Sequence, residues 1–500
     1  MAQDRPLTVG ILLYQDVTTL DFVGPATYFE FLGVVSDHKV NIFTIADKAG
    51  GPVQPVNLIP LEASLSIDEA PFKWDVLLVP GGLGAASVVN NKKMLEYVRQ
   101  AASQSTDVLM VCTGSRIMSA TGLLDGKNAT TNKSQFDEIS ELYPHVNWIH
   151  QARWVVDGKW WTSSGVSAGI DMGYAYFCAK FGTDVATKVV RTMEYVPNTD
   201  SSNDPFAQNP TASTPESAKV GTQNILVPIL RVGILLYENA TPLDFMGPGT
   251  YLEKIQLILG QKTEFYTVAQ KAGPVQPLNM IPLHATFAVD EAPVDWDILV
   301  IPGGVGTEAA IENEKFMAYV KAAAENSKQV LSVCTGGRML GATGLLDGKK
   351  ATTNKIEYNE ISAAYPNVSW IEQARWVVDG KWWTASGVTA GLDMAHAFIS
   401  VNYGEAYADK IATVLEYVPN KDPSNDPFVQ PKSQCNANLP IFFFHGATGS
   451  ATNGIAFDRF ATKQRPVIHL NFAEKRSFAS ATSSSSPARD RTDSQLYSQR

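Results

Sequence analysis

One long internal repeat constrains the fold of this chain more than any other feature of its sequence. The segment VGILLYQDVTTLDFVGPATYFE (residues 9–30) returns as VGILLYENATPLDFMGPGTYLE (residues 232–253), and QARWVVDGKWWT at residue 151 returns unchanged at residue 373. The offset is 223 positions before the KAGGPVQP of the first copy and 222 after it, because the second copy reads KAGPVQP. Each copy is about 200 residues long, the size of an independent domain rather than a solenoid unit. The sequence therefore predicts two tandem domains with one fold.

We place the first domain at residues 7–209, a linker at 210–229 and the second domain at 230–431. The linker region NPTASTPESAKVGTQN is rich in Pro, Ser and Thr, which is typical of connecting segments. About twenty flexible residues reach roughly 25 Å, far enough for the two domains to pair with each other. If the single domain works as a two-fold dimer, its fused copies form an intramolecular pseudo-dimer.

The last part of the chain, residues 432–500, differs from both copies. Its segment LPIFFFHGATGSATNG resembles the first strand and HG loop of an α/β-hydrolase, but no Gly-x-Ser-x-Gly elbow follows it. The end SFASATSSSSPARDRTDSQ is too polar to bury the apolar surface that folding needs. We expect a partly disordered tail with a hydrolase-like fragment.

Composition excludes several classes of protein. A formal net charge of −10, without a clustered basic surface, disfavours nucleic acid as a partner. No apolar run reaches about 18 residues, and no basic and apolar leader precedes the first strand, so neither a membrane span nor secretion is expected. Of the four cysteines, Cys112 and Cys334 are equivalent, while Cys178 and Cys435 have no counterpart. A disulfide framework is therefore not expected, and a reducing, cytoplasmic location is.

The pattern of apolar runs predicts the fold class. TVGILLY, VNIFTIA, DVLLVPGG and DVLMVC are short, β-rich and nearly unbroken, as strands buried on both faces are. Helical patterns such as KKMLEYVRQAASQ and GIDMGYAYFCAKFG lie between such runs. Strand alternating with helix predicts an α/β domain with a doubly wound, mostly parallel sheet. WVVDGKWWT predicts a hairpin appended to that sheet, with Asp-Gly at its turn.

The run VLMVCTG places Cys112 at the end of a strand, before a tight turn and the helical stretch SRIMSATGLL. A thiol at a helix N-terminus is expected to favour its thiolate form, which is the reactive species. A buried cysteine can also be a small apolar residue without a chemical role. The return of the same turn around Cys334, in a copy that has otherwise drifted, favours a reactive role for both.

Asp21 and Asp244 follow the first strand of each copy, in LDFVGP and LDFMGP. Each could cap the helix that begins there. Alternatively, the strand before each aspartate neighbours the cysteine strand, which would bring the carboxyl close to the sulfur. A carboxyl beside a thiolate has a raised pKa and can donate a proton.

The motif PGG ends the DVLLV strand of the first copy and returns in the second, as Gly81 and Gly82 and as Gly303 and Gly304. Glycine lets the backbone approach a ligand closely and aim N–H groups at developing negative charge. We expect these residues to bind substrate or an oxyanion, with an ordinary turn as the alternative.

Taken in order and spacing, LDFVGP, VPGGLG, VCTGSRIMSATGLLDGKNATTN and SSGVSAGIDM resemble the DJ-1/PfpI superfamily, which is class I glutamine amidotransferase-like. Within it they are most similar to the isocyanide (isonitrile) hydratase branch. The resemblance covers both copies almost end to end, down to MEYVPN at residue 193 and NDPF at residue 203. It implies two tandem flavodoxin-like domains, a dimer as the usual assembly and a cysteine nucleophile.

The resemblance also implies a reaction on a small-molecule substrate. In isocyanide hydratases the cysteine attacks the terminal carbon of R–N≡C, and water converts the resulting thioimidate to an N-formamide. Isocyanide carbon suits a soft nucleophile with a proton donor beside it. No cofactor is implied, and no His/Cys cluster at metal-ligand spacing predicts a metal. The matching positions are Cys112 and Cys334 as nucleophiles, Asp21 and Asp244 as acid/base groups, and Thr113 and Thr335 as supporting polar residues.

Two other functions stay open, one enzymatic and one not. The family commonly has ATTHW after the helix, whereas both copies read ATTNK, with Asn132 and Asn354 in place of histidine. This departure disfavours a glyoxalase or deglycase acting on 2-oxoaldehydes, which remains the alternative enzyme. A DJ-1-like redox-sensing or small-molecule-binding protein, whose cysteines oxidise reversibly, is the alternative outside enzymes. Asp171 and Asp393 follow a turn at a helix start, where helix capping or a dipole interaction is expected.

Overall fold

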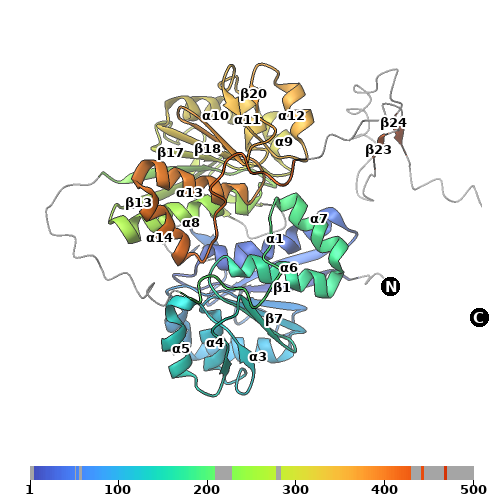
Figure 1. Cartoon of the computed structure of the whole chain (residues 1–500), viewed down its shortest axis with the longest axis vertical. Helices are drawn as coiled ribbons and strands as arrows, with labels where there is room; N and C mark the ends of the chain where they lie inside the picture. The colour runs from blue at the N-terminus through green and yellow to red at the C-terminus, as the bar shows by residue number, and fades with distance from the viewer. Residues whose placement is uncertain are drawn as a thin grey trace, which may run out of the picture. The chain divides into compact units, whose positions relative to one another are not determined.

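Each half of the chain folds around a seven-stranded, mostly parallel β-sheet flanked by helices (Figure 1). The computed structural model describes residues 5–50, 52–55, 59–208, 228–277, 283–429, 441–443 and 467–469. The main elements of the first half are β1 (Leu7–Leu12), α1 (Thr19–Val35), β2 (Val40–Ala46), β5 (Leu65–Ser66), β6 (Val76–Val79), α2 (Ala85–Asn90), α3 (Lys92–Gln104), β7 (Asp107–Val111), α4 (Gly114–Ala120), α5 (Phe136–Leu142), β10 (Trp154–Asp157), β11 (Trp160–Ser163), α6 (Ala168–Phe181) and α7 (Thr183–Met193).

The second half repeats these elements in the same order. They are β12 (Leu230–Leu235), α8 (Pro242–Leu259), β13 (Thr263–Ala269), β16 (Phe287–Ala288), β17 (Ile298–Ile301), α9 (Thr307–Ile311), α10 (Glu314–Asn326), β18 (Gln329–Val333), α11 (Gly336–Ala342), α12 (Tyr358–Ala364), β21 (Trp376–Asp379), β22 (Trp382–Ala385), α13 (Ala390–Tyr403) and α14 (Glu405–Val414).

The strand order of the first sheet is β10-β11-β7-β6-β1-β2-β5, and the second sheet has the corresponding order. Strand β1 pairs in parallel with β2 and β6, and β6 pairs in parallel with β7. Strands β10 and β11 form the antiparallel hairpin, and β11 joins the sheet in parallel beside β7. The predicted doubly wound sheet with an appended hairpin is therefore confirmed in both halves.

One expected strand pairing is wrong. We expected the strand before Asp21 to neighbour the cysteine strand, but β6 lies between β1 and β7. The order follows from the chain reversing direction across the sheet: β2 is added on one side of β1, and β6 and then β7 on the other. Such a reversal leaves a crevice at the carboxyl ends of the strands, where ligands bind in open α/β sheets.

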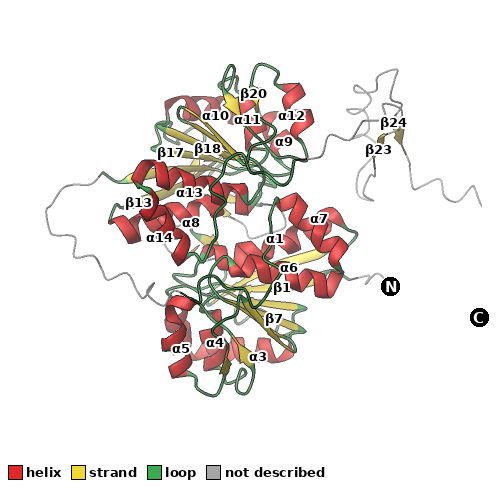
Figure 2. Ribbon diagram, in the orientation of Figure 1, coloured by secondary structure: helices red, strands yellow, loops and turns green. Residues whose placement is uncertain are grey.

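Burial explains why these segments form central strands. Every residue of β6 and β7 is buried. Helices cover both faces of the first sheet, with α1, α6 and α7 packed together in one group and α2, α3 and α4 in another. Figure 2 shows the yellow strands of each half with red helices on either side. Nearly unbroken apolar strands are the expected sequence for a sheet covered on both faces.

The two halves share contacts within one compact unit, residues 1–429. Helix α1 packs against α8. In a small four-stranded sheet, β15 (Leu283–Ala285) of the second half pairs antiparallel with β4 (Leu61–Glu62) of the first, so that Leu283 faces Leu61. Next to this pair, His284 Nδ1 lies 3.2 Å from Glu62 Oε1. That the fused halves replace a dimer of separate chains stays a prediction.

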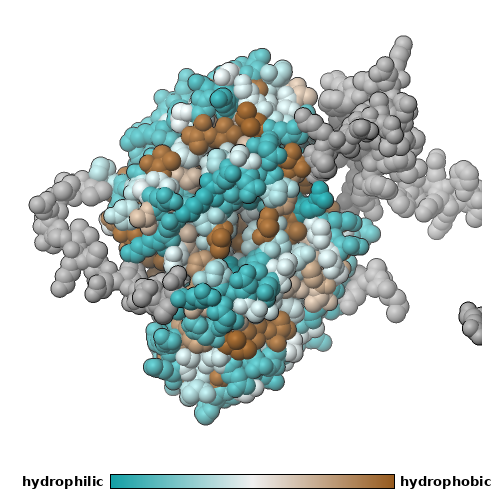
Figure 3. Space-filling view, in the orientation of Figure 1, coloured by the Kyte–Doolittle hydropathy of each residue, from teal (hydrophilic) through white to brown (hydrophobic). Residues whose placement is uncertain are grey.

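Much of the predicted linker and tail lies outside the described residues. Of the linker at 210–229, the structure describes only residues 228 and 229. In the second compact unit, residues 430–500, the strands β23 (Ile441–Phe443) and β24 (Val467–His469) pair in parallel. Among the described residues, no helix is both long and apolar enough to cross a membrane. On the face seen in Figure 3, hydrophobic side chains lie in separate groups among hydrophilic ones.

Candidate active site

The two cysteines lie on equivalent sharp turns at the carboxyl ends of β7 and β18. Cys112 has a φ of 57° and Cys334 a φ of 58°, in the left-handed region that costs a non-glycine residue roughly 1–2 kcal/mol. Their side chains are nearly buried, at 7% and 6% exposed. Each turn leads directly into a helix, α4 or α11. This is the predicted strand, turn and helix arrangement of a nucleophile elbow.

The ATTNK segment is anchored to the cysteine turn in both halves. Thr131 Oγ1 donates to the carbonyl of Cys112 at 3.2 Å, and Thr353 Oγ1 donates to that of Cys334 at 2.9 Å. Ser115 Oγ also donates to the Cys112 carbonyl, at 3.0 Å. These bonds fix the backbone of the turn and keep the ATTNK segment beside it.

Asp21 is fully buried in the first turn of α1. Its Oδ2 accepts a hydrogen bond from the N–H of Gly81 at 2.9 Å, and Asp244 accepts one from Gly303 at 2.8 Å. Burial raises the pKa of Asp21, and a hydrogen bond with the Cys112 thiol partly offsets this rise, while among the described residues Oδ1 accepts no hydrogen bond from a nitrogen or oxygen donor. No side chain caps this helix start. The carboxyl therefore binds the PGG loop and does not cap the helix.

The PGG loop, which follows the intervening strand β6, holds the aspartate and the threonine in place. The N–H of Gly82 donates to Thr113 Oγ1 at 3.0 Å, and Thr113 Oγ1 donates back to the carbonyl of Gly82 at 3.2 Å. A Cβ at Gly81 would lie 2.5 Å from the backbone nitrogen of Thr113 and 2.8 Å from Asp21 Oδ2. Only glycine fits between these two groups.

This arrangement differs from the expectation that the glycine N–H groups face the substrate. In both halves they donate to protein side chains, since Gly303 N–H binds Asp244 and Gly304 N–H binds Thr335 Oγ1 at 2.9 Å. Their observed contacts position the aspartate and the threonine. A direct role in binding substrate stays a prediction.

Burial dominates the electrostatics of the site. It raises the pKa of Asp21 to about 7 and that of Asp244 to about 8, against an opposing effect of the glycine N–H bonds. Burial, and next the neighbouring aspartate, raise the pKa of the Cys112 and Cys334 thiols well above the usual value. The expected thiolate is therefore not the resting form, because desolvation outweighs the helix N-terminus. Each Cys–Asp pair therefore holds one proton, on the sulfur, above about pH 7 in the first half and above about pH 8 in the second.

The side-chain amides of Asn132 and Asn354 have different hydrogen-bond partners in the two sites. Asn354 Nδ2 donates to the sulfur of Cys334 at 3.4 Å. Asn132 Nδ2 donates instead to Glu416 Oε1 at 3.1 Å. Each asparagine also accepts a backbone N–H two residues further on, at Ser134 or Ile356. The amide of this asparagine thus binds the cysteine sulfur in the second half and a glutamate carboxylate in the first.

A tyrosine that the sequence analysis did not single out contacts the PGG loop in each half. Tyr14 OH donates to the carbonyl of Pro80 at 2.8 Å, and Tyr237 OH donates to that of Pro302 at 2.9 Å. The LLY ending of the first strand repeats in both copies and was the signal available for it. The second site has an extra hydroxyl, because Thr307 stands where the first half has alanine.

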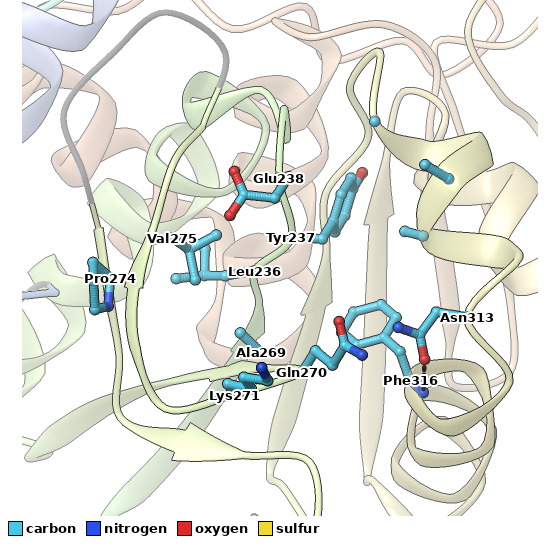
Figure 4. Close-up of a pocket in the computed structure, with 13 residues that line it drawn as sticks. Leu236, Tyr237, Glu238, Ala269, Gln270, Lys271, Pro274, Val275, Asn313 and Phe316 are labelled. Carbon is cyan, nitrogen blue, oxygen red and sulfur yellow. Dashed lines mark hydrogen bonds between the residues drawn. The ribbon is translucent and has the colours of Figure 1, made fainter.

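Each tyrosine also lines a cavity. The cavity beside Tyr14 measures about 450 Å³ and the one beside Tyr237 about 330 Å³. Figure 4 shows Tyr237, Gln270 and Phe316 along one side of the second cavity, with Val275 across from them. The cysteine and aspartate of neither site line these cavities. Each tyrosine thus contacts both the cavity and the PGG loop of its half.

Asp171 and Asp393 lie in the first turns of α6 and α13, as expected for a dipole interaction, but their carboxylates bind groups outside the helix instead of capping it. Asp171 Oδ2 accepts from Arg153 Nε at 2.8 Å, and Oδ1 accepts from Tyr195 OH at 2.6 Å. Asp393 makes the same contact with Arg375, at 2.8 Å. Each carboxylate is therefore half of a buried ion pair. A repeated QARW arginine was the signal for its partner.

Sequence reasoning also missed two buried glutamates that join the halves. Glu194 and Glu416 are the glutamates of the repeated MEYVPN and LEYVPN segments. Each accepts hydrogen bonds from loops of the opposite half, Glu416 from Lys133 N at 2.8 Å and Glu194 from Lys355 N at 2.7 Å. The repeated segments are visible in the sequence, but no local pattern indicates contacts that span 161 residues for Glu194 and 283 for Glu416.

Comparisons with known proteins find one family along both halves. A profile described as DJ-1/PfpI family matches residues 8–178 and 230–401. The chain is 33% identical over 192 residues to the isonitrile hydratase of Pseudomonas putida, covering 38% of this chain and 79% of that protein. It is 27% identical over 338 residues to protein DJ-1 homolog B of Arabidopsis thaliana, covering 66% and 71%. A deglycase of Thermococcus kodakarensis is 33% identical over 120 residues, covering 24% and 70%.

Proposed function

The chain belongs to the DJ-1/PfpI family, with one family domain in each half, and from this premise we propose that it hydrates isocyanides to N-substituted formamides. It would act as an isonitrile hydratase-like carbon-oxygen lyase without a cofactor. One site lies in each of the domains that we place at residues 7–209 and 230–431. The observation that carries the proposal is the buried pair of a cysteine on an elbow and an aspartate whose pKa burial raises to about 7 or 8.

The pair supports both proton transfers that the first step needs. Above neutral pH the Asp21 carboxylate takes the thiol proton of Cys112 as the sulfur bonds to the terminal carbon of R–N≡C. The protonated carboxyl then gives this proton to the same carbon. The product is a thioimidate, S–CH=N–R, and the aspartate is again a carboxylate. Asp244 and Cys334 would do the same in the second half.

Water completes the reaction. The aspartate carboxylate removes a proton from a water molecule whose oxygen attacks the thioimidate carbon, and it then gives this proton to the nitrogen. The C–S bond of the resulting S–CH(OH)–NH–R adduct breaks as its hydroxyl proton passes through the aspartate to the leaving sulfur, which releases R–NH–CHO and returns the thiol. Gly81 and Gly82, with Thr113, would hold the aspartate and the cysteine turn in register during these steps.

The similar proteins favour a second candidate enzymatic activity, that of a deglycase. The Thermococcus deglycase is as similar per residue as the isonitrile hydratase, although over a shorter stretch. A cysteine and a carboxyl could also act on 2-oxoaldehydes.

A redox-sensing role fits less well, because reversible oxidation favours an exposed cysteine of low pKa and both cysteines are buried with raised pKa. Cys112, Cys178 and Cys334 are free thiols, as a reducing cytoplasmic setting would keep them.

The test is formamide production from an aryl and an alkyl isocyanide by the full chain and by Cys112→Ala, Cys334→Ala and the double variant. We expect each single variant to retain turnover and the double variant to lose it. No formamide from the folded full chain with either substrate would contradict the proposal. Loss of methylglyoxal in the same preparation would then favour the deglycase or glyoxalase candidate.

A further inference from the structure

Two glutamates cross from one half of the chain into the cysteine site of the other. Glu194 follows α7 directly, and Glu416 lies two residues after α14. Both have left-handed backbone conformations, with φ of 51° and 46°, which are unfavourable for a residue with a side chain. Both are nearly or fully buried, at 0% and 2% exposed. A strained backbone and a buried carboxyl both cost free energy, so the contacts of these glutamates must stabilise them.

Glu416 joins two loops of the first half. Its Oε1 accepts from the N–H of Lys133 at 2.8 Å and from Asn132 Nδ2 at 3.1 Å. Its Oε2 accepts from the N–H of Gly165 and from Ser164 Oγ, each at 2.5 Å. A Cβ at Gly165 would lie 2.2 Å from Glu416 Cδ, so the second loop has room for this carboxyl only because residue 165 is glycine.

Glu194 makes the reciprocal contacts in the second half. Its Oε1 accepts from the N–H of Lys355 and its Oε2 from the N–H of Gly387, each at 2.7 Å. Ser386 Oγ also donates to Oε2. A Cβ at Gly387 would lie 2.3 Å from Glu194 Cδ. The two glutamates therefore accept hydrogen bonds from equivalent backbone N–H groups in opposite halves.

Both loops lie against the cysteine turn. The first contains the ATTNK segment, which is anchored to the carbonyl of Cys112 through Thr131. The second continues from β11, where Ser163 pairs with Val111, the residue before Cys112. In the second half, the amide of Asn354 reaches the sulfur of Cys334 from the first of these loops. A carboxyl that ties the two loops together therefore sets the shape of the cysteine site.

The glutamates also act on the cysteines electrostatically. Glu416 contributes to the raised pKa of Cys112 and Asp21, and Glu194 to that of Cys334 and Asp244. The other titratable groups facing the cysteines are Asp21 and Tyr14 in the first half, and Asp244, Tyr237 and Glu357 in the second. Those facing the glutamates are Lys133, Arg153 and Asp204 for Glu416, and Lys355, Arg375 and Asp426 for Glu194.

We propose that Glu416 and Glu194 are positioning residues exchanged between the halves, so that each cysteine site is completed by a carboxyl of the other half. Each clamps the two loops that wall the opposite cysteine. The role in turnover rests on the proposed function, whereas the role in setting the reactivity of the thiol does not.

The first experiment measures thiol reactivity and needs no substrate. Full-length Glu416→Gln and Glu194→Gln are alkylated with iodoacetamide across a pH series, and the Cys112 and Cys334 peptides are quantified separately by mass spectrometry. Glu416→Gln should move the midpoint for Cys112 down by about half a pH unit or more, because a negative charge near the thiol is lost. Cys334 in the same molecule reports on folding. Glu194→Gln should show the opposite pattern.

The second experiment measures turnover in chains with one reactive cysteine. Glu416→Gln should lower formamide formation about tenfold more in the Cys334→Ala chain than in the Cys112→Ala chain, and Glu194→Gln should show the reverse. Glu141→Gln, an exposed surface change, is the matched control. Equal effects on both cysteines, in reactivity or in turnover, would overturn the inference. If no isocyanide is turned over, the proposed function fails and the alkylation pattern alone decides this inference.

Discussion

The side-chain amide of Asn354 donates to the sulfur of Cys334 across 3.4 Å. Its counterpart Asn132 makes no such contact and donates to Glu416 instead. Two sites with nearly the same sequence thus differ in the group that faces the nucleophile. An N–H donor at this place stabilises a sulfur that becomes negatively charged during proton transfer.

We expect Asn354→Ala to lower kcat about tenfold in the Cys112→Ala chain, because a hydrogen bond to a developing charge is lost. Steady-state formamide formation measures this change. Asn132→Ala in the Cys334→Ala chain is the matched comparison and should cost less in kcat, since its amide bonds to a carboxyl rather than to sulfur. Equal losses in the two chains would contradict this interpretation of the asymmetry.

The pH dependence of turnover should differ between the two sites. The reactive state holds one proton per pair, so activity rises as the aspartate ionises. The Cys334→Ala chain, which uses Asp21, should show an ascending limb near pH 7, and the Cys112→Ala chain, which uses Asp244, one near pH 8. Activity should fall again only at alkaline pH, where the raised pKa of the thiol is reached. Superimposable profiles would show that the two environments are equivalent.

Stability should depend on pH through Asp21 in a direction opposite to that of an ordinary carboxyl. Its pKa is about 7 in the folded chain and 3.8 as the unperturbed value, so ionisation favours the unfolded state. Stability is therefore lost as pH rises from about 4 through 7. We expect Asp21→Asn to raise the thermal unfolding midpoint at pH 8 more than at pH 5, and calorimetry tests this. A larger gain at pH 5 would contradict the burial argument.

Gly81 should tolerate no side chain. A Cβ there would lie 2.5 Å from the backbone nitrogen of Thr113 and 2.8 Å from Asp21 Oδ2, so Gly81→Ala must displace the aspartate or the cysteine turn. We expect at least a tenfold loss of kcat in the Cys334→Ala chain and a destabilisation of about 1–3 kcal/mol. Gly303→Ala in the Cys112→Ala chain is the equivalent test in the second half. An unaffected kcat with unchanged stability would show that the PGG loop moves freely.

Local patterns were enough to predict the fold class and the elements on which the candidate site residues lie. Cys112 was recognisable because an apolar strand ends directly at a Thr-Gly turn, and Asp21 because it begins a helix after the first strand. The hairpin followed from Asp-Gly between two apolar segments. All of these features depend on residues a few positions apart, where sequence and conformation are closely linked.

Long-range relationships could not be predicted in the same way. The strand β6 was predicted, but its place between β1 and β7 was not, because strand order depends on how the whole sheet winds and not on any one strand. The partners of Asp171 were missed because Arg153 lies outside the helix that contains Asp171, and the local sequence indicates only capping or a dipole interaction. Burial changed the expected protonation of Cys112, since the degree of desolvation emerges only from complete packing.

The exchange of Glu194 and Glu416 has a consequence for how this gene can evolve. Duplicated domains usually drift, because one copy can lose its function while the other is retained. Here a substitution at residue 416 in the second copy would change the surroundings of Cys112 in the first copy. A substitution at residue 194 would change those of Cys334 in the second. Selection on either active site therefore preserves sequence in both copies, which would keep the duplication from decaying into one working domain and one remnant.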